Sequence, residues 1–112
     1  MFIQRPTVRA TAAALFLLPL AAMAAPVKVA VLETLSGPAA ASGLAYRAAV
    51  RYAIDEMNTS GGWNGEPVQL LEYDNQGGPA GAADKLKAAI ADGVQIVVQG
   101  ASSAIGGQIT ED

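Results

Sequence analysis

VKVAVLETLSGP, residues 27–38, is the stretch that decides the fold. Its first six residues, 27–32, are mostly apolar and β-branched, which is typical of a strand buried on both faces of a sheet. The stretch ends in Gly37 and Pro38, a dipeptide that marks a loop. A strand of this kind followed by a loop and a helix predicts one unit of an α/β fold.

The same order of elements recurs along the chain. Residues 43–58 carry apolar side chains at helical spacing, with Ser42 as the expected N-cap, and residues 67–74 form the second expected strand. The remaining expected elements are a helix over residues 80–91, a strand over 94–98 and a helix from Ala104 onward. Helices of this length between strands predict parallel βαβ units with right-handed crossovers. We therefore expect the α/β class, with a parallel sheet and helices on both of its faces.

Residues 1–24 have the pattern of a secretory signal. Arg5 and Arg9 provide a positive start, residues 10–20 provide an apolar core, and a small-x-small cleavage pattern ends at Ala24. The apolar stretch is shorter than the roughly 20 residues that a membrane-spanning helix needs. We therefore expect export to the periplasm, with cleavage after Ala24.

The composition excludes several classes of function. The 112 residues contain neither Cys nor His, which excludes thiol nucleophiles, Ser-His-Asp triads and disulfide frameworks. Without residues 1–24 the net charge is −5, which disfavours nucleic acid as a partner. Neither a G-x-G-x-x-G turn nor a phosphate-binding loop is present, which argues against a dinucleotide-binding enzyme and against phosphoryl transfer. We expect no catalytic residues, no metal site and no cofactor.

The chain is expected to be the first piece of a longer protein. Residues 108–112 contain no Gly, Pro or basic residue that would end a helix. A chain of this size buries only about 60–65% of its surface on folding. We therefore expect residues 25–112 to be the first part of a larger lobe, and a complete minimal domain is the less favoured alternative.

Several short motifs follow one another in a fixed order. They are the strand at 27–32, LSGP at 35–38, NTSGGWNG at 58–65, YD at 73–74, DGV at 92–94 and GASS at 100–103. This series resembles the start of the periplasmic leucine/isoleucine/valine-binding proteins, which are substrate-binding components of branched-chain amino-acid ABC importers. The resemblance implies a type 1 periplasmic binding protein, with strand order 2-1-3 in this part and a ligand held between two lobes.

The expected ligand site lies where the first and third strands end. In open α/β sheets, ligands bind beyond the carboxyl ends of the strands at the switch point, here between the loops at 33–43 and 99–104. Ser102 and Ser103 open a helix there, where hydroxyl and N–H groups can hold a carboxylate. The alternative is that one serine serves only as the N-cap. The resemblance implies that Ala101, Ser102 and Ser103 contact the carboxylate of the ligand.

The sequence also gives an expectation for four other residues. The resemblance places Ser42 where some relatives have a ligand-facing aromatic residue, so its small side chain implies a roomier pocket. Glu33 is either a carboxylate that faces the cleft or an ordinary solvated loop residue, and composition favours the solvated one. Asp74 is expected to accept hydrogen bonds from loop N–H groups, and Trp63 is expected to be a packing residue.

The function implied by the resemblance is that of an extracytoplasmic solute-binding protein. It would deliver amino acids, by family default branched-chain ones, to the membrane permease of an ABC importer. Two alternatives remain open. They are the ligand-binding ectodomain of a receptor or sensor with the same fold, and a truncated product without activity.

Overall fold

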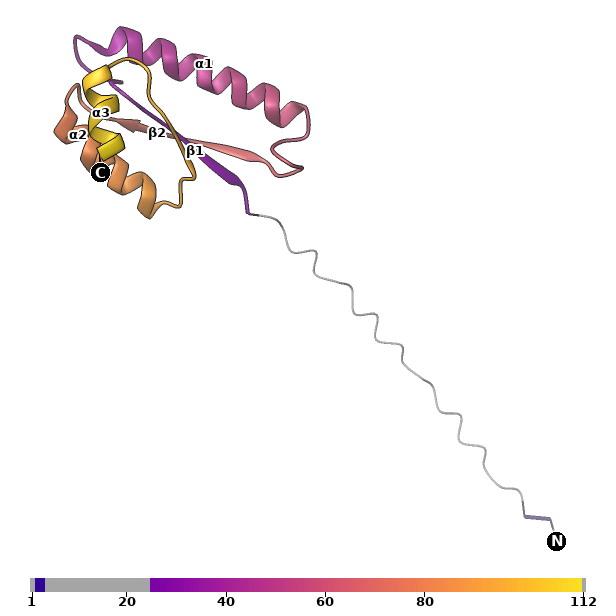
Figure 1. The fold of residues 1–112 in the computed structure, drawn as a ribbon. Helices are drawn as coiled ribbons and strands as arrows, with labels where there is room; N and C mark the ends of the chain where they lie inside the picture. The colour runs from indigo at the N-terminus through magenta and orange to yellow at the C-terminus, as the bar shows by residue number, and fades with distance from the viewer. Residues whose placement is uncertain (1, 4–24, 112) are drawn as a thin grey trace.

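The computed structural model describes residues 2–3 and 25–111. Strands and helices alternate along the second range (Figure 1). They are β1 (Val27–Glu33), α1 (Ala40–Thr59), β2 (Val68–Asp74), α2 (Pro79–Ala91), β3 (Ile96–Val98) and α3 (Ser103–Glu111). The predicted α/β class is confirmed. The signal pattern and its cleavage point after Ala24 lie outside the described residues.

The three described strands form one parallel sheet in the order β2-β1-β3. The register between β1 and β2 runs from Val27 opposite Val68 to Glu33 opposite Asp74. The shorter ladder between β1 and β3 ends with Val31 opposite Val98. This order confirms the prediction, and it places the switch point between the carboxyl ends of β1 and β3.

Helices cover both faces of the sheet, as predicted (Figure 1). On one face, Ile54 of α1 packs against Val29 and Val68. On the other face, the side chains of Ala30 and Leu32 form a core with α2 and α3; its other buried members are Tyr73, Ala82, Leu86, Ala89 and Ile105. Because successive side chains of a strand point to opposite faces, β1 contributes to both cores.

The start of α1 differs from the sequence prediction. The helix begins at Ala40, its N-cap position is Ala39, and no side chain caps it, so the prediction of Ser42 as N-cap is wrong. Gly37, with φ of +78°, and the turn after it lead the chain directly into the helix. Gly43 lies inside the helix. Because it has no side chain, the start of the helix can approach the backbone of Thr34 closely.

The other boundaries differ by one or two residues. β2 begins at Val68 and not at Pro67, and α2 begins with Pro79 at its first turn. β3 begins at Ile96 because the N–H of Val94 donates to the carbonyl oxygen of Ala89 at 3.0 Å, in the turn that ends α2.

Candidate ligand site at the carboxyl ends of β1 and β3

The loops after β1 and β3 meet at the carboxyl edge of the sheet. Glu33, the last residue of β1, accepts two backbone hydrogen bonds through Oε1. They come from the N–H of Gly100, at 2.5 Å, and from the N–H of Ala101, at 3.3 Å. These bonds join positions 67 and 68 residues apart in the sequence. The structure therefore brings together the two loops that the switch-point argument selected.

Glu33 itself is completely buried, with 0% of its surface exposed. The expectation of a solvated loop carboxylate is therefore wrong. The physical reason is its place in the strand, since Glu33 follows Val29 and Val31 on the face of β1 that α1 covers. Its second carboxylate oxygen, Oε2, is also buried and has no hydrogen-bond partner among the described residues.

Ser102 and Ser103 lie at the start of α3, as predicted. The N–H of Ile105 is 3.5 Å from Oγ of Ser102, the geometry of a weak N-cap, and the N–H of Gly106 donates to the carbonyl oxygen of Ser102 at 2.9 Å. Ser102 is half-buried, whereas Ser103 is exposed. Ser102 therefore caps the helix weakly, and Ser103 is the exposed serine of the same turn.

Ala101 and Ser42, the two other predicted site residues, also lie near this edge. The N–H of Ala101 is already taken by Glu33. Ser42 is exposed in the first turns of α1. Tyr46 lies one helical turn further along α1, on the same side. Its ring lies against Gly100 so closely that a Cβ on that glycine would be 2.7 Å from Cδ1 of the tyrosine.

Sequence reasoning missed Tyr46, which is 44% exposed beside the loop after β3. The spacing of four residues from Ser42 was the available signal, because such residues share one side of a helix.

The end of β2 holds the loop after β1 in place. Oδ1 of Asp74 accepts the N–H of Leu35 at 3.0 Å and the N–H of Gln76 at 2.9 Å, so the prediction for Asp74 is confirmed. Hydrogen bonds from the side chain of Ser36 and from the N–H of Leu35 hold the pKa of Asp74 below its ordinary value. Next to it, the hydroxyl of Thr34 donates to Oδ1 of Asn75 at 2.7 Å. The loop is thus fixed before any ligand arrives.

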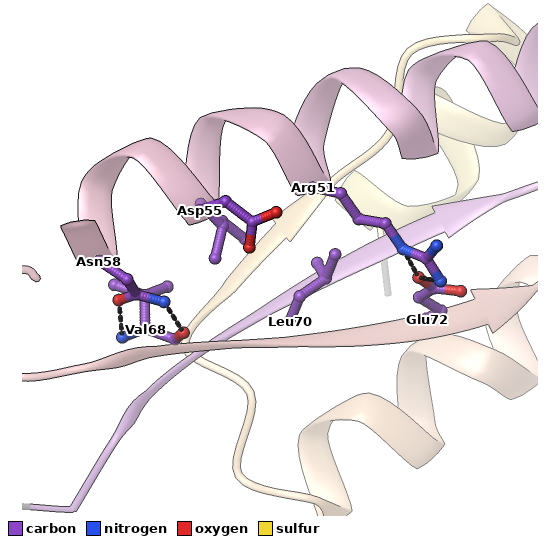
Figure 2. Close-up of a pocket in the computed structure, with 7 residues that line it drawn as sticks. Arg51, Asp55, Asn58, Val68, Leu70 and Glu72 are labelled. Carbon is purple, nitrogen blue, oxygen red and sulfur yellow. Dashed lines mark hydrogen bonds and ion pairs between the residues drawn. The ribbon is translucent and has the colours of Figure 1, made fainter.

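Two hollows lie away from this edge, and neither is a better candidate. The first, about 340 Å³, lies between α1 and the edge strand β2 (Figure 2). There the amide of Asn58 pairs with the N–H and the carbonyl oxygen of Val68, both at 2.8 Å, and Arg51 pairs with Glu72. Most of its polar groups therefore satisfy one another.

The second hollow, about 210 Å³, has an apolar lining that includes Trp63, Val27 and Met57. It lies at the amino-terminal end of β1, far along the strand from Glu33. Trp63 is 51% exposed there, so its expected role as a packing residue stays a prediction.

Within residues 2–3 and 25–111, no cluster of three or more acidic side chains could hold a metal ion. Over the same ranges, no helix is both long enough and apolar enough to cross a membrane.

Comparison with known proteins identifies the family. The pattern described as "Periplasmic binding protein" matches residues 26–112. The chain is 67% identical over 91 residues to the Leu/Ile/Val-binding protein homolog 4 of Brucella abortus, covering 81% of this chain and 22% of that protein. It is 31% identical over 77 residues to the Leu/Ile/Val-binding protein of Escherichia coli, covering 69% of this chain and 21% of that protein.

Solved structures agree with this result. The leucine-, isoleucine-, valine-, threonine- and alanine-binding protein of Brucella ovis, in its closed conformation, matches with 67% identity and a TM-score of 0.75. That match covers 79% of this chain and 23% of that one. The branched-chain amino acid transporter substrate binding protein LivJ of Streptococcus pneumoniae, in complex with isoleucine, matches with 27% identity and a TM-score of 0.73, over 78% of this chain and 25% of that one.

The chain thus spans about a fifth of the length of the curated relatives it matches. The resemblance to the leucine/isoleucine/valine-binding proteins is confirmed. Because the family pattern covers residues 26–112, the chain belongs to the periplasmic binding protein family, a class of solute-binding proteins found outside the cytoplasm.

Proposed function

We propose that this protein binds amino acids in the periplasm and delivers them to the membrane permease of an ABC importer. The observation that carries the proposal is the meeting of the β1 and β3 loops around the start of α3, held by Glu33 and capped by Ser102. Relatives named for leucine, isoleucine and valine support branched-chain amino acids as the ligand class. The proposed role is binding, without a catalytic step.

The carboxylate of the ligand would lie at the N-terminus of α3. The first N–H groups of a helix have no acceptor within it, and the helix dipole adds partial positive charge. The N–H groups of Ser103 and Ala104 and the exposed hydroxyl of Ser103 supply donors there. Such a site can hold an anion without Arg or Lys.

Residues 25–112 would form one wall of the binding cleft. We propose that they are the first part of the amino-terminal lobe, and that the opposite wall comes from a second lobe that closes on the ligand. Ser42 would face the cleft from the first turns of α1. We also propose that residues 1–24 are removed after Ala24, so that the exported protein begins at Ala25.

A double substitution at the start of α3 tests the site. Replacing Ser102 and Ser103 by alanine removes a cap and a donor at the carboxylate. A hydrogen bond to a charged group contributes about 1.5–3 kcal/mol, so the affinity for the amino acid should fall at least tenfold. Calorimetry on the purified protein measures the change.

Ser60→Ala is the matched control, because Ser60 is an exposed serine at the other end of α1. We expect it to leave the affinity unchanged. Unchanged affinity in the folded double variant would contradict the assignment of the two serines. Absence of amino-acid binding in the unmodified protein would contradict the proposed function itself.

A further inference from the structure

A buried carboxylate without a cation lies behind the proposed site. Glu33 is 0% exposed, and neither of the two ion pairs in the described part of the chain includes it. Burying a charge is costly unless hydrogen bonds or opposite charges compensate for it. The compensation seen here is the pair of N–H groups of Gly100 and Ala101.

We propose that Glu33 is the positioning residue of the ligand site, which holds the loop after β3 so that Ser102 and Ser103 face the ligand. This inference rests on the proposed function. Glu33 does not touch the ligand in this scheme. It acts through the backbone that it holds.

The pairing of the strands shows why a side chain is needed for this task. The ladder between β1 and β3 ends with Val31 opposite Val98. Beyond that point the loop after β3 leaves the sheet, and the carboxylate of Glu33 continues the connection to Gly100 and Ala101. The two residues that follow are Ser102 and Ser103. A change in the loop's position would therefore move the start of α3 directly.

Tyr46 holds the same loop from the side of α1. Its ring lies against Gly100, where a Cβ would be 2.7 Å from two ring carbons, Cδ1 and Cζ. The loop is thus fixed by the hydrogen bonds that it donates to Glu33 of β1 and by an aromatic ring from α1. Glycine at position 100 leaves room for the ring, because any Cβ there would overlap Tyr46.

The arrangement also divides the donors between two acceptors. Glu33 takes the N–H groups of Gly100 and Ala101, so a bound carboxylate would use other donors of this loop, among them those of Ser103 and Ala104. Ala101 therefore contributes the position of the loop and not its N–H group.

Three variants of the protein as its gene encodes it test this inference by calorimetry with leucine, isoleucine and valine. Glu33→Ala removes the acceptor, and we expect affinity to fall at least about tenfold. Glu33→Gln keeps an oxygen that can accept the same bonds, and we expect it to restore affinity to within about threefold of the unmodified protein.

Asn58→Ala is the matched control. It also removes two hydrogen bonds to backbone groups, those to Val68, but far from the loop after β3. It should lower the stability and leave the affinity unchanged. Equal losses of affinity in Glu33→Ala and Asn58→Ala would overturn the inference, because the loss would then follow global stability.

Unchanged or higher affinity in Glu33→Ala would also overturn the positioning role of Glu33. The same holds if Glu33→Gln binds the amino acids as weakly as Glu33→Ala does. Amide hydrogen exchange is a second test, which still works if Glu33→Ala does not fold or if the protein binds no amino acid. The amides of Gly100 and Ala101 should exchange slowly in the unmodified protein and in Glu33→Gln. Rapid exchange of both amides in the unmodified protein would overturn the positioning role, independently of the proposed function.

Discussion

Replacement of Gly43 by alanine tests how tightly α1 packs on the loop that follows β1. Gly43 is buried, and a Cβ added to it would lie deep inside the van der Waals radius of the carbonyl oxygen of Thr34. The same Cβ would be 2.8 Å from the carbonyl carbon and 3.1 Å from the nitrogen of Thr34. These neighbours are backbone atoms, so no side-chain rotation can relieve the overlap.

The size of the effect follows from two opposing contributions. Overpacking of a filled site costs about 1–3 kcal/mol, and contact with rigid backbone favours the upper end of that range. Alanine is more favourable than glycine inside a helix by about 0.5–1 kcal/mol. The net loss of unfolding free energy should therefore be about 2 kcal/mol, a large share of the 5–15 kcal/mol that is typical of a folded protein.

Urea unfolding followed by circular dichroism measures this loss as a shift in the transition midpoint. Gly107→Ala is the matched control, since Gly107 also lies in a helix but has open space where the Cβ would go. That variant should gain about 0.5–1 kcal/mol. If Gly43→Ala were as stable as the unmodified protein, or gained stability as the control does, the close packing of α1 on Thr34 would be refuted.

Two further predictions concern pH. Because the pKa of Asp74 is lowered in the folded protein, its stabilising contribution is present above the ordinary value of 3.8 and is lost as the pH falls through the folded-state pKa. The gap in unfolding free energy between the protein and Asp74→Asn should therefore shrink below about pH 4, and a constant gap would contradict the hydrogen bonds assigned to Asp74. Burial, together with the hydrogen bond to Asp92 and its charge, raises the pKa of Tyr73 to about 12. The stability that this tyrosine contributes is complete below pH 10 and is lost as the pH rises toward 12. In an alkaline titration, the difference in phenolate absorbance between the protein and Tyr73→Phe should therefore appear only near pH 12. Its appearance near pH 10 would contradict the buried environment of the ring.

Much of the fold could be predicted because its signals are local. The apolar, β-branched run in β1 identifies a strand buried on both faces, and the helical spacing of Val50, Ile54 and Met57 identifies the buried side of α1. The predicted start of α1 was wrong because Ser42 is a residue type that favours the N-cap position. In the folded chain the N-cap position is Ala39, and Gly43 allows close packing of the helix against Thr34.

The site could be predicted only in part, because its contacts join distant segments. The loop around Ser102 and Ser103 follows from the topology of parallel sheets. The burial of Glu33 does not, since its hydrogen-bond donors come from residues 100 and 101, far along the chain. For the same reason, no local pattern indicates that the ring of Tyr46 lies on Gly100.

A measurement of amino-acid binding tests the proposed function most directly. The purified protein, as its gene encodes it, is titrated with leucine, isoleucine and valine in a calorimeter, with the Ser102→Ala, Ser103→Ala double variant measured alongside. We predict saturable binding with a dissociation constant well below about 1 mM, weakened in the double variant. A folded protein that binds none of the three amino acids, or that binds them equally well without the two serines, would contradict it.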